Sequence, residues 1–473
     1  MQQNDTSTVE VAGFSWRRRD HTRGNLLVSL LVLALPSIGT SLAGAVAYQL
    51  IDLKFLSLLG AAPLAAVVVT NQSLRQVAFL LVLGASLGGQ AIIARSVGEG
   101  RTQHAEHVAG QVLLLGSLFC LIFAVVGGLF PRELLSLVAR DPAVLEVGVP
   151  YVRLAFILMF GFVLIPLSGS VLNGAGDATT PMIIMLITTP VSLFAEWCLI
   201  FGHLGAPAFG VSGVALGSTL GSLVGVTLAF WVLLTGRTRL HLRPRHLRLD
   251  LGVIRQLLHI SWQPALQLMG RTLVIVYFLR LAGGFGAKVQ AAYGIGIRLE
   301  LVVILITFPI ANACATLVGQ NLGAGSPRRA WRSVGVALAV NIAVGCLFAT
   351  LFLLFRQPFM ATFSDDPEVI AVGSEYLLYV AGAMLLIGPY FVGFRALQAA
   401  QDMTSPMLIS NGSALLVALP LGHYLSTGTS LGPTGLWIAI LVNTFVVTLV
   451  TLGWLATGRW TRRHPRVPHL PEI

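Results

Sequence analysis

Long apolar runs, separated by short polar breaks, follow one another along almost the whole chain. Each run holds roughly twenty or more residues, which is enough for a helix to cross the hydrocarbon core of a bilayer. The pattern predicts an all-α integral membrane protein with about twelve transmembrane helices. The predicted spans are 26–57, 62–93, 104–130, 143–171, 180–203, 209–235, 252–281, 287–318, 328–355, 368–398, 405–426 and 433–457.

One polar stretch is written twice. The stretch at 169–182, GSVLNGAGDATTPM, has a similar second copy at 394–407, FRALQAAQDMTSPM. Asp177 in the first copy and Asp402 in the second lie 225 residues apart. The same interval separates Gly98 from Gly323 and Tyr151 from Tyr376. Three separated landmarks at one interval predict an internal duplication. In each copy we expect the aspartate to cap the following helix, which a proline in the first turn can begin without a donor.

The duplication predicts two lobes of six helices each. Because each half has an even number of spans, both halves enter the membrane from the same side, which makes the repeat parallel. We therefore divide the chain into an N-terminal arm (1–24), an N-lobe (25–236), a basic linker (237–250), a C-lobe (251–458) and a C-terminal tail (459–473).

Arginine gathers on one side of the predicted membrane. The arm, the linker, the loop between the second and third spans of the C-lobe, and the tail carry most of it, which places the N- and C-termini in the cytoplasm of a multi-pass cell-membrane protein. These arginines are Arg17, Arg18, Arg19, Arg23, Arg237, Arg239, Arg243, Arg245, Arg248, Arg328, Arg329, Arg332, Arg459, Arg462, Arg463 and Arg466. For the linker, a surface-lying segment and a purely topogenic cluster both remain open.

Composition narrows the function. Hydrophobic residues make up 55% of the chain and charged residues 10%, so an ordinary soluble surface could not be covered. The net charge of +11 does not indicate nucleic-acid binding, because the arginines stand in short clusters between apolar runs. The four cysteines lie inside apolar runs without CxxC spacing, so we expect neither a disulfide nor a metal site.

No catalytic motif interrupts the spans. The two lysines, Lys54 and Lys288, do not follow glycine, so a GxxxxGK[ST] phosphate loop is excluded, and HExxH is absent from the sequence. The pattern GxSxG occurs at 84–88 and at 428–432, but neither copy follows a predicted strand, so neither is a nucleophile elbow. We therefore expect no enzyme and no cofactor. Two equivalent bundles facing each other predict a secondary transporter whose energy comes from an ion gradient.

Two acids within the spans are candidate coupling groups, because a carboxylate in hydrocarbon is costly. Asp52 lies near the outer end of the first span, where an interfacial pair with Lys54 is the alternative. Glu196, in the fifth span, has no basic neighbour in its own segment. Ser192 precedes Glu196 by four residues and therefore shares its helix face.

Other intramembrane charges allow a role either in the cavity or in structural ion pairs. They are Arg75, Arg271, Arg298 and Glu300. Arg298 and Glu300 stand two residues apart on a helix and do not face each other, so each is expected to find a partner elsewhere. Prolines inside spans, Pro36 among them, permit kinks, but the sequence does not say which of them moves.

Several of these segments together resemble the multidrug and toxic compound extrusion (MATE) family over nearly all of residues 25–458. The resemblance rests on LALP at 33–36, the Asp52 segment followed by LSLLG, ARSVGEG and GQNLGAG, the doubled GDATTPM and QDMTSPM, and LIFG at 199–202. It implies a twelve-helix antiporter of two six-helix lobes. Such a protein exports small organic, often cationic, compounds across the lipid bilayer in exchange for protons or sodium ions.

The resemblance also implies a cation site in the N-lobe. Asp52 matches the family's first-span acid, Glu196 an aspartate of the fifth span, and Ser192 a common asparagine. Ser218 stands where a threonine is frequent, and Pro36 would be the bend of the first helix that responds to the cation. The changes from Asn to Ser and from Asp to Glu weaken a sodium site and favour protons slightly.

In the C-lobe the seventh span offers Gln267 and Arg271 rather than an acid. The chain therefore looks more like the branch named after the DNA-damage-inducible membrane protein, in which coupling is assigned to the N-lobe. A lipid-linked precursor flippase of the same wider superfamily and a major-facilitator transporter are the alternatives. We expect a monomer. The identity of the substrate does not follow from the sequence.

Overall fold

The computed structural model describes residues 20–42, 44, 48–139 and 141–462, and this part of the chain folds into helices without strands. The first half contains α1 (Leu26–Leu42), α2 (Gln49–Ser57), α3 (Ala61–Val69), the π-helix η3 (Thr70–Leu74), α4 (Arg75–Gly98), α5 (Thr102–Leu129), α6 (Pro131–Ser136), α7 (Pro142–Ile157), α8 (Phe160–Ala175), α9 (Thr179–Phe201), η4 (His203–Gly205) and α10 (Val211–Leu234). After η5 (Pro244–Leu247), the second half contains α11 (Leu251–Gly284), α12 (Ala287–Gly323), α13 (Pro327–Ala361), α14 (Pro367–Ala399), α15 (Thr404–Ser413), η6 (Ala414–Ala418), α16 (Leu419–Thr427), α17 (Pro433–Ala456) and α18 (Arg459–Arg462).

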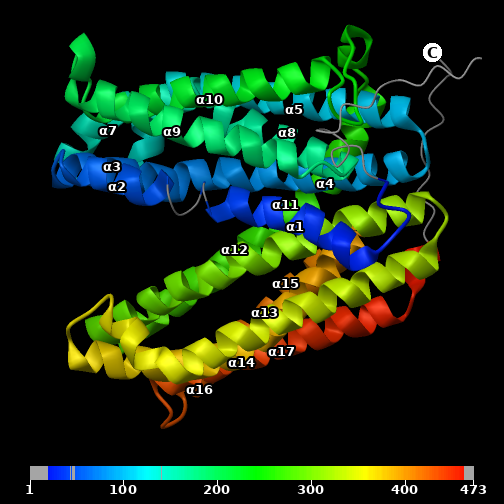
Figure 1. Cartoon of the computed structure of the whole chain (residues 1–473). Helices are drawn as coiled ribbons and strands as arrows, with labels where there is room; N and C mark the ends of the chain where they lie inside the picture. The colour runs from blue at the N-terminus through cyan, green and yellow to red at the C-terminus, as the bar shows by residue number, and fades with distance from the viewer. Residues whose placement is uncertain (1–19, 43, 45–47, 140, 463–473) are drawn as a thin grey trace, which may run out of the picture.

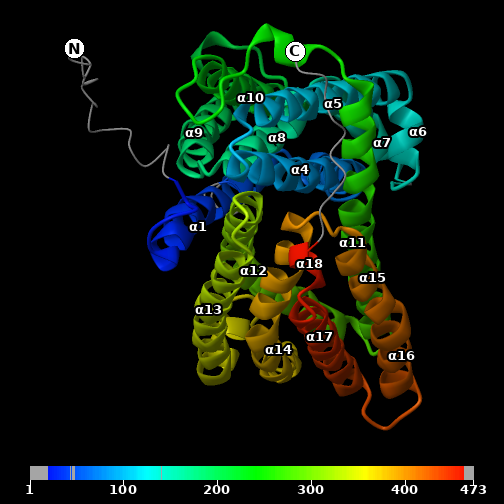
Figure 2. The ribbon, with the colours of Figure 1, turned by 90° about the vertical axis from the view of Figure 1, so that its right-hand side faces the viewer.

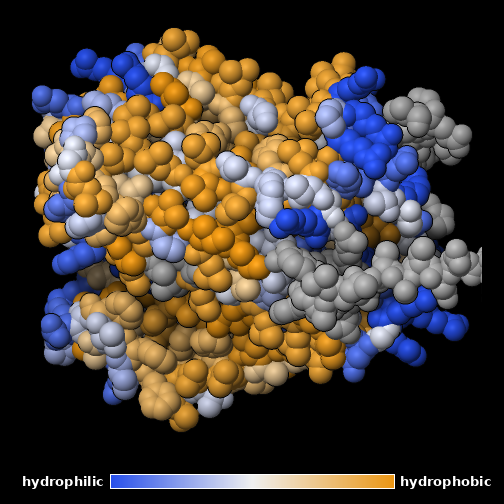
Figure 3. Space-filling model, turned by 45° about the horizontal axis from the view of Figure 1, so that its top comes forward, coloured by the Kyte–Doolittle hydropathy of each residue, from blue (hydrophilic) through white to orange (hydrophobic). Residues whose placement is uncertain are grey.

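The predicted all-α membrane fold is confirmed. The described residues include 11 helical segments long and apolar enough to cross a membrane, and these match the predicted spans from the second to the twelfth. The first predicted span is divided between α1 and α2, with residues 43 and 45–47 between them outside the described part. Apolar side chains cover the middle of the molecule, whereas polar residues gather at its ends (Figure 3).

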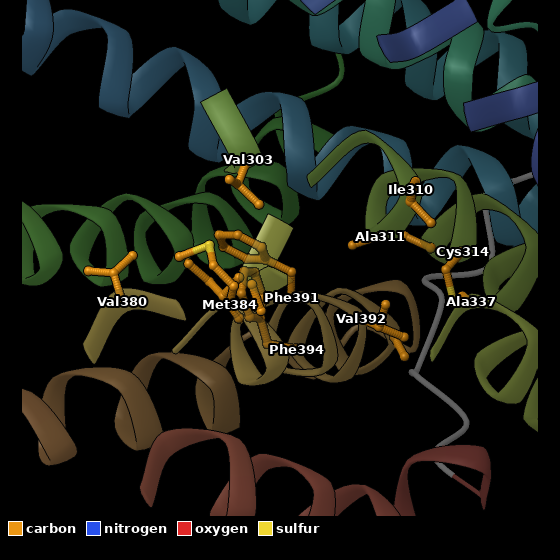
Figure 4. Close-up of a cluster of buried hydrophobic side chains, with 14 of the residues drawn as sticks. Val303, Ile310, Ala311, Cys314, Ala337, Val380, Met384, Phe391, Val392 and Phe394 are labelled. Atoms are coloured by element: carbon orange, nitrogen blue, oxygen red, sulfur yellow. The ribbon is translucent and has the colours of Figure 1, made fainter. Parts of the chain in front are cut away.

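Two helix groups make up the molecule, one above the other in Figures 1 and 2. The upper group holds α2 to α10 and the lower group holds α12 to α17. Each group has its own apolar core. In the lower core, Met384 and Phe391 of α14 lie close together, with Val303 of α12 above them (Figure 4).

The first helix of each half packs on the other half. Leu30 and Leu33 of α1 are buried in the lower core, together with residues of α12 and α13. In return, Val253 and Leu257 at the start of α11 are buried in the upper core. Figure 2 shows α11 running from the upper group into the lower one. Packing therefore crosses the sequence boundaries predicted for the two lobes, and the exchange joins them.

The two groups meet at one end of the molecule, which we call the terminal end because the blue and the red ends of the coloured ribbon both lie there (Figure 1). A Cβ atom added to Gly98 of α4 would come within 2.7 Å of the Gln320 Cα atom of α12. A Cβ atom on Gly323 would come within 2.9 Å of the Glu99 nitrogen. The repeated glycines thus let the two backbones touch, and the contact is reciprocal. Away from this end the groups diverge, and the surface between them is hollowed (Figure 3).

The basic linker is folded against α5. The Gln111 side chain of α5 donates hydrogen bonds to the carbonyls of His246 (3.2 Å) and Arg248 (2.8 Å) and accepts one from the Asp250 amide. His107 contacts the Asp250 carboxylate at 3.1 Å. Partial burial acts to raise the Asp250 pKa, but hydrogen bonds from the Val253 amide and from His107 outweigh it, so the pKa lies below its usual range. The segment therefore has a defined contact with the N-lobe.

The duplicated loops adopt the same turn. Asp177 accepts hydrogen bonds from the amides of Thr179 and Thr180. Asp402 accepts one from the Ser405 amide at 3.2 Å. The predicted capping by both aspartates is confirmed. The residue before each aspartate has positive φ, +92° at Gly176 and +64° at Gln401. Of these two residues, only Gln401 has a side chain, so the left-handed conformation is sterically unfavourable in the second copy and not in the first.

Replacing Gln401 with Gly should stabilise the protein by about 0.5–1 kcal/mol, because the left-handed backbone then carries no Cβ atom. The measurement is thermal unfolding in detergent, with Gln401→Ala as the control, since alanine retains the Cβ atom and should give no gain. The reverse change, Gly176→Gln, should destabilise, because its Cβ atom would meet His21 at 2.9 Å. A lower melting temperature for Gln401→Gly than for Gln401→Ala would contradict this explanation.

Candidate functional site: a carboxylate cluster in the N-lobe

The structure brings the two candidate acids together. Asp52 lies on α2 and Glu196 is fully buried on α9, and their carboxylates interact electrostatically. The Tyr48 hydroxyl donates a 2.6 Å hydrogen bond to Glu196 Oε1. The buried atoms Asp52 Oδ1 and Glu196 Oε2 have no hydrogen-bond partner among the described residues. The cluster therefore presents two buried carboxylate oxygens without a partner in the described part of the chain.

A stripe of glycines on α10 positions Glu196. Gly213, Gly217, Gly221 and Gly225 recur every four residues and so share one helix face. A Cβ atom on Gly217 would come within 2.5 Å of the Glu196 backbone, and one on Gly221 within 2.7 Å of the Ser192 backbone. Because the stripe has no side chains, α10 packs directly on α9. This close packing excludes lipid and water from the Glu196 side of the cluster.

Arg75 supplies the positive charge near the cluster. It lies in the first turn of α4, directly after η3, and interacts electrostatically with Asp52. Its guanidinium donates to Asn71 Oδ1 at 3.2 Å and lies 4.4 Å from the centre of the Phe162 ring. Lys54 is exposed and forms no hydrogen bond or ion pair with Asp52 in the described structure. The neighbour of Asp52 is thus an intramembrane arginine and not the interfacial lysine.

The remaining N-lobe candidates lie around this cluster with different contacts. Ser192 is buried beneath Gly221, one turn before Glu196. Ser218 donates its hydroxyl hydrogen bonds to the carbonyls of its own helix, at Val214 (2.8 Å) and Ala215 (3.1 Å). Pro36 lies inside α1, two residues beyond the part of that helix that is buried in the lower core. Their roles in cation binding stay predictions.

The C-lobe charges form an ion pair backed by aromatic rings. Arg271 of α11 lies 3.8 Å from Glu300 Oε1 of α12, and the Tyr376 hydroxyl donates to Glu300 Oε2 at 3.4 Å. The Tyr376 ring packs against Trp437, with ring centres 4.8 Å apart. Glu300 thus finds its partner on another helix, as expected. Arg298 is exposed and forms no ion pair with a described residue.

Gln267 belongs to a different group of side chains. Its Oε1 atom accepts a hydrogen bond from Gln398 at 3.1 Å, and Gln398 in turn accepts one from Arg395. This group lies at the contact between the two lobes and not beside Glu300.

The N-lobe cluster is suited to taking up a positive charge. When both carboxylates are ionised, Asp52, Glu196 and the Arg75 guanidinium together carry one net negative charge. A single proton or a monovalent cation would restore the balance, and buried carboxylates in membranes commonly bind one or the other. Among the described residues, His, Cys, Asp and Glu side chains form no group of three that could hold a metal ion.

Two parts of the site were not singled out from the sequence. Tyr48 stands four residues before Asp52, the spacing that places two side chains on one helix face, and this signal was available. The glycine stripe of α10 was also visible as a four-residue period. The contact between Tyr48 and Glu196 joins residues 148 positions apart, so it required the folded chain.

Comparisons with known proteins agree with this architecture. The MatE family model matches residues 36–198 and 265–423. A probable multidrug resistance protein NorM from Thermotoga maritima is 24% identical over 439 residues, covering 92% of this chain and 93% of that protein. An FAD transporter from Shewanella oneidensis is 25% identical over 425 residues, covering 88% of this chain and 92% of that one.

The fold is shared with solved MATE structures. The crystal structure of a MATE protein in the bent conformation superimposes with a TM-score of 0.86 at 18% identity, covering 93% of this chain and 97% of that one. The relatives are transporters and not enzymes. Because the family model and the solved structures are those of MATE proteins, they favour this family over the major-facilitator alternative. With the family model covering more than half of its length, this chain belongs to the MatE family of membrane transporters.

Proposed function

We propose that this protein is a secondary antiporter that exports small organic compounds, and that the carboxylate cluster of the N-lobe couples export to the entry of a cation. The observation that carries the proposal is the pair of buried oxygens without a hydrogen-bond partner among the residues that the structure describes, Asp52 Oδ1 and Glu196 Oε2, with the Tyr48 hydroxyl bonded to the other oxygen of Glu196. A cation that binds there removes the charge imbalance, and its release restores the imbalance. Export of multiple drugs agrees with the name of the Thermotoga relative.

The coupling ion we favour is the proton. Hard metal cations are held by several oxygen ligands together, whereas the described cluster offers two carboxylate oxygens without a hydrogen-bond partner, Asp52 Oδ1 and Glu196 Oε2. A proton needs one oxygen. Coupling through the N-lobe alone is the arrangement expected for the branch named after the DNA-damage-inducible protein.

The terminal end is assigned to the cytoplasm. The basic linker and the described arginines of the first and last segments lie there, which is the bias expected of cytoplasmic loops. Since the two lobes touch at this end and diverge at the other, our proposal takes this arrangement as the outward-facing state of the transport cycle. In this state the carboxylate cluster would collect its cation from outside.

The test is dye transport in inside-out vesicles, with a pH gradient compared to a sodium gradient of equal size. Our proposal expects ethidium uptake that follows the pH gradient, collapses with a protonophore and is insensitive to sodium. Uptake driven by sodium alone would reject the proton but keep antiport. Without uptake of ethidium under either gradient, antiport of organic cations fails and a lipid-linked precursor flippase becomes the better hypothesis.

A further inference from the structure

A second charged group lies buried at the contact between the lobes. Arg395 of α14 is 1% exposed. Its Nη1 atom donates to Gln398 Oε1 at 2.7 Å, and its Nη2 atom donates to Gln90 Oε1 of α4 at 2.8 Å and also to Asn312 Oδ1 of α12. One of these acceptors, Gln90, belongs to the other lobe. The arginine therefore bridges the two lobes through neutral amide groups.

This arginine has no acidic partner. All three acceptors are amide oxygens, its Nε atom has no hydrogen-bond partner, and no carboxylate forms an ion pair with it among the described residues. A buried guanidinium without a counter-charge carries a large desolvation cost. The void beside it, lined by Leu87, Ala91, Ala315 and Ala399, has no room for even a water-sized ligand in this state. The positive charge of Arg395 therefore has no space beside it for a ligand while the terminal end is closed.

Separating the lobes at this end would uncover the arginine. The bonds that cross the contact are those from Arg395 to Gln90 and from Gln90 to Thr316. Further bonds join Thr316 and Gln320 to the carbonyls of Asn173 and Gly174. When Gln90 leaves, Nη2 loses one of its two acceptors, and Nε has none among the described residues, so both atoms have a hydrogen to donate. Two parallel donors on one edge match the two oxygens of a carboxylate, sulfonate or phosphate group.

We propose that Arg395 is a substrate-specificity residue that binds an anionic group of the exported compound in the state open to the terminal end. The remaining partners, Asn312 and Gln398, belong to the same lobe and would hold the guanidinium in place as the lobe moves. The inference rests on the proposed export function and says more about its substrates. It extends that class to organic anions and zwitterions, with the carboxylate cluster left to the coupling ion.

The test compares probes that differ in charge. Inside-out vesicles are loaded by a pH gradient with flavin mononucleotide, with riboflavin, its uncharged counterpart, or with the cation ethidium. We expect Arg395→Gln to lower flavin mononucleotide uptake at least tenfold and to change ethidium uptake less than twofold. Arg280→Gln, which removes the same charge from an exposed position of α11, should leave all three rates unchanged.

Four results would overturn the proposal. An equal loss of all three probes would make Arg395 a lock between the lobes only, and no change would make it dispensable. If ethidium uptake depends on chloride in the wild type and loses that dependence in Arg395→Gln, with an unchanged preference between the two flavins, the site holds a free anion instead. Riboflavin uptake equal to that of flavin mononucleotide in the wild type would also argue against it.

A binding measurement separates this inference from the transport proposal. If wild-type vesicles move none of the probes, export fails, but the arginine can still be tested by equilibrium dialysis of purified protein. The background is Gly98→Leu, whose side chain would prevent the closed contact. We expect flavin mononucleotide to bind at least tenfold more tightly than riboflavin there, and Arg395→Gln to abolish the difference. Equal binding of both flavins would reject the anion site independently of transport.

Discussion

Asp52→Asn and Glu196→Gln should each lower gradient-driven export about a hundredfold. Either change removes one negative charge, so the three-group cluster with Arg75 becomes neutral without taking up a cation. A loss of about 3 kcal/mol in the interaction between a buried charge and its partner corresponds to about that factor. Both amides nearly preserve side-chain volume, so the fold should survive. The measurement is ethidium uptake into inside-out vesicles at equal protein level.

Two further variants test which contacts of the two acids are responsible for the loss of export. Tyr48→Phe removes only the hydroxyl that donates to Glu196 and should slow export without abolishing it. Lys54→Gln should have no effect, because Asp52 interacts with Arg75 rather than with this exposed lysine. If Lys54→Gln abolished export while Asp52→Asn did not, the interfacial pair would be the functional one. Full activity of Asp52→Asn would move coupling to Glu196 alone.

The pattern of apolar runs was sufficient to predict the fold class, because a bilayer imposes a minimum length on each helix that crosses it. The duplication also identified equivalent positions in the two halves of the chain. Gly98 and Gly323, noticed only as landmarks of the repeat, turned out to be the points where the lobes touch. What the repeat did not reveal is the exchange of first helices, because an amphipathic pattern shows that a face is buried but not which helix covers it.

The candidate site was predicted only in part, for a physical reason. Intramembrane acids are rare and costly, so Asp52 and Glu196 were conspicuous one by one. Tyr48 and Arg395 are residue types that usually have structural explanations, and only their partners distinguish them. The repeat could even mislead here. Arg75 and Glu300 stand 225 residues apart at equivalent positions, yet they carry opposite charges and serve different pairs.

Replacing Gly98 with Leu should abolish export while leaving the fold intact. The leucine side chain would occupy the place of the Gln320 backbone, which cannot yield because Gly323 and Glu99 form the reciprocal contact beside it. Since each lobe has its own core, the lobes can fold and yet fail to close. The protein would then remain open at the terminal end and could not complete a transport cycle, with uptake reduced at least about a hundredfold.

The rate at which a cysteine at the contact between the lobes is labelled distinguishes a folded protein that stays open from a misfolded one. In a background with the four native cysteines replaced by alanine, Thr316→Cys should react slowly with a maleimide added at the terminal end, because Thr316 is 1% exposed at the contact. Adding Gly98→Leu should accelerate the reaction at least tenfold. Gly335→Leu is the control, since a Cβ atom there meets open space and the contact is untouched. Slow labelling in Gly98→Leu, together with normal uptake, would show that the two lobes separate and close by some contact other than the one between the repeated glycines.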